Sequence, residues 1–211
     1  MGTSKRKLSN EIKKLLKEKS LSSINESAPG LTKKILTKSN LGDNFDESET
    51  IGNSIRIISS QFVSLSHNGF KGKTKKELIT DPISQQEFIE MILEMIETTT
   101  IIESKILEKS LKIVMCEFLE HDEFDVYEFA QLLFYQIIYQ VLLGDLNDNI
   151  KDIHEELDYE LIQNMVKNAA NQIMNDKVYT KVNLFIDRKV LLVDVLDEII
   201  VQTSNASFGE F

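Results

Sequence analysis

The chain alternates between segments with regularly spaced apolar residues and short polar breaks. Within the segments apolar residues recur three and four positions apart, which is the spacing of one face of an α-helix. This spacing predicts helices over residues 5–20, 31–38, 48–68, 84–97, 101–120, 124–143, 153–175 and 188–201. We therefore expect an all-α fold, a multi-helix globular bundle.

The segment 124–143 differs from the others because it is apolar almost all round. A helix without a polar face is expected in the core, surrounded by other helices. The sequence therefore predicts that this is the most buried helix and that it ends at Gly144.

Particular residues mark where other helices begin and end. Ser48 is a candidate N-cap, and Ser84 with Glu87 matches a capping box. Gly69 suits the left-handed conformation that ends many helices. These residues set expected ends for two helices.

Four segments lack a clear helical pattern. Residues 39–48 and 70–83 read as loops, and residues 204–211 as a short polar tail. Residues 178–185 are rich in β-branched side chains, which fit a strand, yet a lone strand would have no partner. The sequence leaves that segment open between strand and helix.

Charge is unevenly distributed along the chain. It carries 34 acidic and 24 basic residues, a net charge of -10, yet residues 1–40 hold ten basic residues against three acidic ones. This division predicts a basic, flexible N-terminal arm over residues 1–45 and a helical domain over residues 46–211. The acidic domain argues against direct nucleic-acid binding, because it would repel phosphates.

Cysteine use and hydropathy indicate a cytoplasmic protein. Cys116 has no second cysteine to pair with, and its apolar neighbours predict a buried, inert thiol. We see no signal-peptide pattern and no apolar run long enough for a membrane span.

One segment partly matches a phosphate-binding loop. Gly72, Lys73 and Thr74 fit the end of the pattern G-x-x-x-x-G-K-[ST], but His67 replaces its first glycine. A helix precedes the segment where the motif requires a strand. We interpret it as a basic turn.

A second segment partly matches a calcium-binding loop. Positions 1, 3, 5 and 12 are Asp145, Asn147, Asn149 and Glu156. Position 6 is Ile150 where the loop requires glycine to turn around the ion. We find no paired nucleophile and base either, so the sequence predicts no metal, no cofactor and no catalytic residues.

Two stretches resemble the QatB proteins of bacterial Qat anti-phage defence systems. The first is Met1-Gly2-Thr3-Ser4 at the start of the chain. The second is the helix that contains Ile51-Gly52-Asn53-Ser54 and runs to the turn at residues 66–70. The resemblance implies a non-enzymatic component of an antiviral defence system.

The resemblance also implies a partner, a QueC-like (QatC-like) enzyme that activates a carboxyl group on a 7-deazaguanine with ATP, accompanied by an ATPase. Once Met1 is removed, the amine of Gly2 would be the acceptor. Near pH 7 an α-amine is more available as a nucleophile than a lysine, since its reference pKa is about 7.7–8.0 against about 10.4. The residues implied for binding or modification are Gly2, Thr3, Ser4, Lys5, Arg6 and Lys7.

A second hypothesis belongs to a different class of protein. The chain would be a helical adaptor whose basic arm binds an anionic membrane or nucleic acid. Salt would weaken such binding steeply. The mass of the intact protein, purified with its neighbours, distinguishes the two hypotheses.

Overall fold

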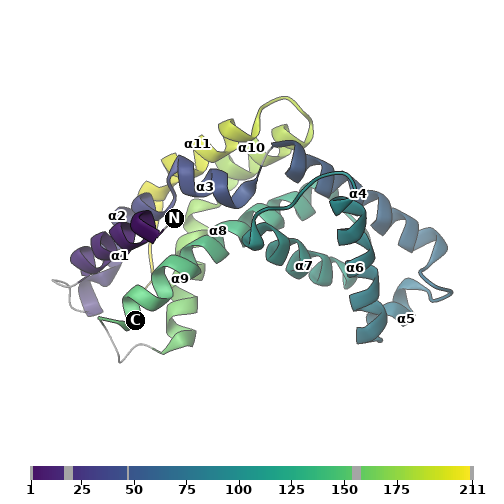
Figure 1. The fold of residues 1–211 in the computed structure, drawn as a ribbon, viewed down its shortest axis with the longest axis horizontal. Helices are drawn as coiled ribbons and strands as arrows, with labels where there is room; N and C mark the ends of the chain where they lie inside the picture. The colour runs from purple at the N-terminus through teal and green to yellow at the C-terminus, as the bar shows by residue number, and fades with distance from the viewer. Residues whose placement is uncertain (1, 17–20, 47, 154–157, 210–211) are drawn as a thin grey trace. The chain divides into compact units, whose positions relative to one another are not determined.

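A computed structural model describes residues 2–16, 21–46, 48–153 and 158–209. Within these ranges the regular elements are all helices, and Phe70 and Lys73 form one isolated β-bridge. The expected all-α fold is therefore confirmed (Figure 1).

The chain divides into two compact units. Unit 1 joins Met1–Gly42 with Ile137–Phe211, and unit 2 is Asp43–Gln136.

Unit 1 brings the two ends of the chain together. Its elements are α1 (Gly2–Leu16), η1 (Leu21–Ser27), α2 (Ala28–Ile35), the second part of α8, α9 (Tyr159–Ile173), α10 (Asp176–Ile186), α11 (Leu192–Gln202) and η2 (Thr203–Asn205). Leu31 and Ile35 of α2 are fully buried, as are Val166 of α9 and Ile199 of α11. Apolar residues from both ends of the sequence thus share one core. The expected boundary near residue 45, and the flexibility of the arm before it, stay predictions.

Unit 2 is built around a cluster of phenylalanines. Its elements are α4 (Ser48–Asn68), α5 (Lys75–Ile79), α6 (Pro82–Glu97), α7 (Lys105–Leu119) and the first part of α8. The Phe62 ring lies 5.0 Å from Phe124 and 5.7 Å from Phe88, and the Phe118 ring lies 5.1 Å from Phe129, between ring centroids. Such offset and edge-to-face contacts add specific attraction to the burial of apolar area.

Helix α8 (Val126–Lys151) is longer than its apolar pattern indicated. It begins where the Asp125 carboxylate accepts hydrogen bonds from the backbone N–H groups of Tyr127 and Glu128, at 2.7 and 3.1 Å. The predicted end at Gly144 is wrong, since the helix continues for two further turns. A mid-helix glycine costs only about 1 kcal/mol, and burial of Leu146 and Ile150 offsets it.

Two predicted helix ends had different outcomes. Helix α4 does end at a left-handed glycine: Gly69 has φ +67° and its N–H donates to the Leu65 carbonyl at 3.0 Å. The capping box at Ser84 is wrong. Helix α6 starts at Pro82, and its N-cap is Asp81, three residues before Ser84. The missing N–H of Pro82 costs nothing in the first turn. A capping box does occur, but at Thr74 and Glu77 of α5.

Three segments without a clear pattern are helical. Residues 39–48 contain most of α3 (Lys38–Phe45), and residues 70–83 contain α5. Residues 178–185, left open between strand and helix, lie inside α10. In α10 Val178, Val182 and Phe185 are buried on one side, so tertiary packing outweighs the preference of β-branched residues for strands.

The C-terminal segment is not a polar tail. Phe208 is buried in unit 1, with only 1% of its surface exposed. Its N–H donates to the Asn25 side-chain oxygen at 2.6 Å, and its carbonyl accepts from the Asn168 amide at 3.1 Å. The segment after α11 is therefore anchored to η1 and α9.

Candidate functional site

The candidate residues at the start of the chain lie in helix α1. The backbones of Gly2, Thr3 and Ser4 form its first turn. The expected helix start at residue 5 thus lies three residues too late. The structure describes no side-chain positions for residues 2–5, and Met1 lies outside the described residues.

Apolar and polar contacts attach the middle of α1 to unit 1. Ile12 and Leu16 are fully buried. The Ser9 hydroxyl donates to the Asn149 side-chain oxygen at 2.6 Å, and Lys13 forms an ion pair with Asp152 at 2.6 Å. The rest of the helix is thus fixed behind its first turn.

A further ion pair joins α1 to α2. Lys34 Nζ lies 2.8 Å from Glu11 Oε2. The hydrogen bond from Lys34 and then its charge lower the pKa of the Glu11 carboxyl, and Lys7 contributes in the same direction. A glutamate between several cations stays ionised, which keeps the two helices connected.

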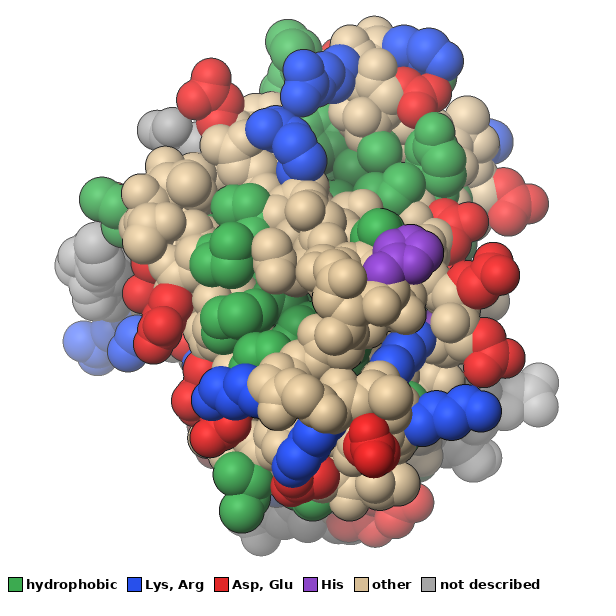
Figure 2. Space-filling view, turned by 90° about the vertical axis from the view of Figure 1, so that its right-hand side faces the viewer, with side chains coloured by type: hydrophobic (Ala, Val, Ile, Leu, Met, Phe, Trp, Pro, Cys, Tyr) green, Lys and Arg blue, Asp and Glu red, His purple; other side chains and the backbone are tan. Residues whose placement is uncertain are grey.

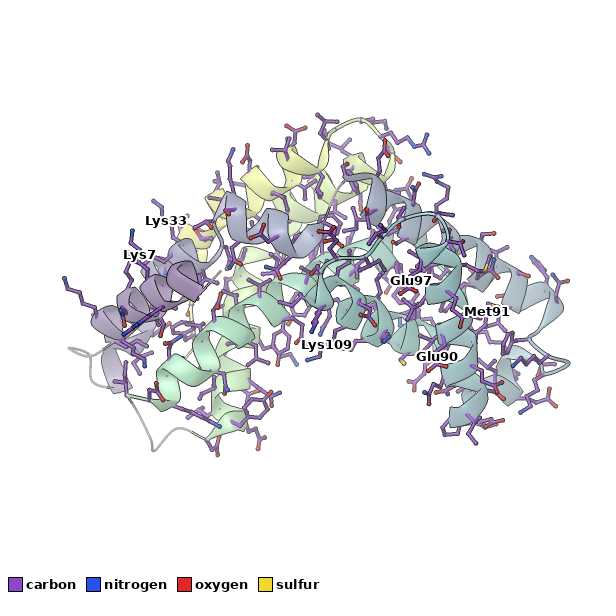
Figure 3. All side chains as sticks on the ribbon, viewed as in Figure 1. Lys7, Lys33, Glu90, Met91, Glu97 and Lys109 are labelled. Atoms are coloured by element: carbon purple, nitrogen blue, oxygen red, sulfur yellow. The ribbon has the colours of Figure 1, made fainter. Side chains whose placement is uncertain are left out.

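The other basic residues of this region remain at the surface. Arg6, Lys7 and Lys14 of α1 and Lys33 of α2 are exposed, and they form no ion pair within the described part of the chain. In Figure 3 the labelled Lys7 and Lys33 extend away from the ribbons of α1 and α2. Of the six proposed residues, the structure thus shows Arg6 and Lys7 as exposed side chains.

The two units differ in charge. Unit 2 contains 18 acidic and 8 basic residues, whereas unit 1 contains 16 of each. Within unit 1, residues 1–42 carry the excess of basic charge and residues 137–211 the excess of acidic charge. The ion pairs of Lys13 with Asp152 and of Lys38 with Asp197, both at 2.6 Å, connect these two segments.

The partial phosphate-loop match is a structural turn. Lys73 forms an ion pair with Asp81 and donates to the Ser84 hydroxyl at 2.7 Å. The hydrogen bond from Lys73 and then the one from the Ser84 hydroxyl hold the pKa of Asp81 far below its usual range. Thr74 is the N-cap of α5. Lys73 therefore binds side chains of the protein itself, which agrees with the interpretation as a basic turn.

The partial calcium-loop match is mostly helical. Asp145 and Asn149 lie on α8, where the Asn149 amide donates to the Asp145 carbonyl at 2.6 Å. Glu156 lies outside the described residues. Across the part of the chain that the structure describes, no group of three His, Cys, Asp or Glu side chains could hold a metal ion.

The histidine and cysteine side chains give no constellation for catalysis within the described residues. The His121 ring stacks on Phe118 with centroids 4.4 Å apart, and its Nδ1 lies 3.8 Å from Glu128. His154 is not among the described residues. Cys116 is exposed on α7, so the prediction of a buried thiol is wrong. Even so, partial burial of the thiol raises its pKa, which disfavours the reactive thiolate.

Helix α8 is long and apolar enough to cross a membrane, judged by length and composition alone. Its most apolar stretch of 18 residues has a mean hydropathy of 1.3, and 56% of it is buried inside the protein. The core helix of a soluble protein passes the same test, so this is weak support for a span.

Comparisons with protein-family models, with curated proteins and with solved structures found no match to this chain. The class of protein that the fold defines is thus an all-α protein of two helical units with a basic N-terminal helix.

Proposed function

We propose that this chain is a non-enzymatic component of an antiviral defence system of the QatB kind. It binds a QueC-like ATP-dependent enzyme through its N-terminal glycine, Gly2, which is the acceptor for a 7-deazaguanine conjugate. Thr3 and Ser4 are recognised with it, and Lys5, Arg6 and Lys7 meet acidic surface at the mouth of the partner's active site. The observation that supports the proposal is the exposure of Arg6 and Lys7, directly behind the first turn of a helix whose middle is attached to unit 1.

The first turn of α1 can open at low cost. The N–H groups of the first four residues of a helix have no partner within it. Unwinding Gly2, Thr3 and Ser4 therefore loses only the bonds to their carbonyls, each worth about 0.5–1.5 kcal/mol. Ser9 and Lys13 stay bonded to Asn149 and Asp152 during this change. The terminus can become extended in a narrow pocket while the rest of α1 stays attached.

The proposal is tested by co-expressing the full chain with a QueC-like enzyme and measuring the mass of its N-terminal peptide. We expect loss of Met1 and an ATP-dependent mass gain on Gly2. Gly2→Val should abolish the gain, because a β-branched side chain narrows access to the amine. The matched control is Gly30→Val on α2, which has open space around it and lies away from the terminus.

Two results would overturn the proposal. One is an N-terminal peptide that keeps its unmodified mass during ATP turnover by the partner. The other is full partner binding by the Gly2→Val variant with an unchanged circular dichroism spectrum. In either case, salt-sensitive binding of the chain to anionic vesicles or to nucleic acid would favour the adaptor hypothesis.

A further inference from the structure

Helices α1 and α2 present exposed lysines that form no ion pair among the described residues. Lys7 and Lys14, two turns apart on α1, lie on one side of that helix, and Lys33 extends from α2. The Glu11–Lys34 ion pair holds the two helices together beside them. We call Lys7, Lys14 and Lys33 the basic face. Each is exposed, and none forms an ion pair within the described residues.

Helix α6 of unit 2 presents the opposite charge. Glu90, Glu94 and Glu97 are exposed, and their spacing of four and three residues places them on one side of the helix. Figure 3 labels Glu90 and Glu97. Among the described residues none of the three has an ion-pair partner, whereas Glu87, one turn earlier, pairs with Lys71 at 2.9 Å. We call Glu90, Glu94 and Glu97 the acidic stripe. Like charges at this spacing repel one another, so a cationic surface placed against them relieves the repulsion.

Apolar surface accompanies the charge in unit 2. Met95, on α6 beside the acidic stripe, is 38% exposed, and Ile83 in the first turn of the same helix is 71% exposed. Figure 2 shows hydrophobic side chains reaching the surface among Lys, Arg, Asp and Glu. A flexible methionine adapts to an opposing surface of varied shape.

We propose that the basic face of one copy docks on the acidic stripe of a second copy, in a weak head-to-tail association. The argument is charge complementarity within one sequence. Residues 1–42 carry ten basic and three acidic residues, and unit 2 carries 18 acidic and 8 basic ones. Two copies therefore always offer each other matching surfaces. Different patches meet in such a contact, so it is heterologous and can continue into chains of molecules.

The strength of this association depends strongly on salt. The charged groups on both surfaces are exposed, and exposed pairs separated by more than a Debye length are screened. Complementary patches of this kind speed association and select orientation more than they add affinity. We therefore expect a rapidly exchanging complex rather than a permanent dimer.

Sedimentation velocity of the full chain over a range of concentrations tests the inference. We expect the sedimentation coefficient to rise with concentration at about 0.01 M ionic strength and to stay constant at about 1 M, where the Debye length falls from about 30 to about 3 Å. A coefficient that is independent of concentration at low salt would overturn the inference.

Charge-reversal variants identify the surfaces. Lys14→Glu/Lys33→Glu and Glu90→Lys/Glu94→Lys should each weaken self-association at least tenfold. An equal mixture of the two variants should restore it, because the first retains the acidic stripe and the second retains the basic face. The matched controls are Lys167→Glu on α9 and Glu117→Lys on α7, both exposed and outside the two surfaces. Controls that weaken association equally, or a mixture that fails to associate, would refute the assignment.

The inference is independent of the proposed function. Gly2→Val should block N-terminal conjugation and leave self-association unchanged. Lys14→Glu/Lys33→Glu should have the reverse effect, because both lysines lie beyond the first turn of α1. The two variants therefore distinguish failure of the self-association proposal from failure of the proposed function.

Discussion

Phe208 closes the C-terminal end of unit 1 with one buried side chain. Its backbone bonds to Asn25 and Asn168 fix the segment, and the ring fills space that would otherwise be empty. Phe208→Ala should therefore lower the free energy of unfolding by about 3–5 kcal/mol, which is the usual cost of such a truncation in a core. Urea denaturation measures it. Leu191→Ala, at a position 66% exposed, should change stability by less than about 0.5 kcal/mol.

Two glycines should respond to the same substitution with opposite signs. Gly69 has φ +67°, and a Cβ there would lie 2.2 Å from the Lys73 carbonyl oxygen, a backbone atom that cannot easily move. Gly69→Ala should destabilise the protein by about 1–3 kcal/mol. Gly144 lies in α8 with nothing within 4 Å of such a Cβ.

Gly144→Ala should accordingly stabilise the protein by about 0.5–1 kcal/mol, since alanine loses less backbone entropy in a helix. Thermal unfolding of the two variants beside the wild type measures both changes. Equal effects of the two substitutions would contradict the backbone conformations described for these two glycines.

At the scale of elements, the start of α6 depends on an ionised carboxylate. Asp81 accepts from the N–H groups of Ile83 and Ser84, and its other oxygen receives Lys73 and the Ser84 hydroxyl. Because its pKa is lowered in the folded state, its stabilising effect is complete above the unfolded pKa of about 3.9. The effect is lost as pH falls from there toward the lowered value.

Asp81→Asn should therefore flatten the loss of thermal stability below about pH 4, where Asp81 becomes protonated in the unfolded wild-type chain while it stays ionised in the folded protein. Melting temperatures between neutral and acidic pH test this prediction. Asp158→Asn, at the N-cap of α9, is the control, since Asp158 accepts the Leu161 N–H at 2.7 Å and pairs with no lysine among the described residues. An unchanged acid profile in Asp81→Asn would show that other groups control α6.

Apolar spacing was sufficient to predict the long helices, and both ends of α4, but it failed at several other helix ends and at short helices. In α3 only Leu41 and Phe45 mark the buried side, and two residues are too few to distinguish a helix from a loop. The continuation of α8 beyond Gly144 depends on packing of Leu146 and Ile150, which local sequence does not reveal. Asp81-Pro82 did carry a readable signal, an N-cap followed by proline in the first turn.

The sequence predicted the basic character of the candidate site, but not which residues its side chains contact. The basic composition of residues 1–40 was visible in the sequence. Which lysines form ion pairs depends on residues more than a hundred positions away, such as Asp152 for Lys13 and Asp197 for Lys38. The same holds for Asn25, a polar residue in a polar segment, whose partner Phe208 lies at the other end of the chain.

At the scale of the whole molecule, the N-terminal segment is part of a core as well as a carrier of charge. Leu31 and Ile35 are fully buried, and the Thr32 hydroxyl lies 3.3 Å from the Thr203 carbonyl, which comes from the C-terminal end of the chain. Ordering this segment costs conformational entropy, and burial of these apolar side chains offsets that cost. Composition predicts a flexible arm, whereas the buried side chains indicate a segment packed into unit 1. One measurement distinguishes these two alternatives.

Limited trypsin digestion of the free protein makes that measurement. Proteolysis of a packed segment requires local opening, and the free energy of opening rises with the number of buried contacts. We therefore expect the earliest cuts within residues 5–7, in or beside the first turn of α1. Cuts at Lys33 and Lys34, next to buried Leu31 and Ile35, should come only with global unfolding. Early cleavage at Lys33 or Lys34 would show instead that the segment is mobile to about residue 45.

Thr32→Val, which removes the hydroxyl, should speed the cuts at Lys33 and Lys34 without changing those within residues 5–7.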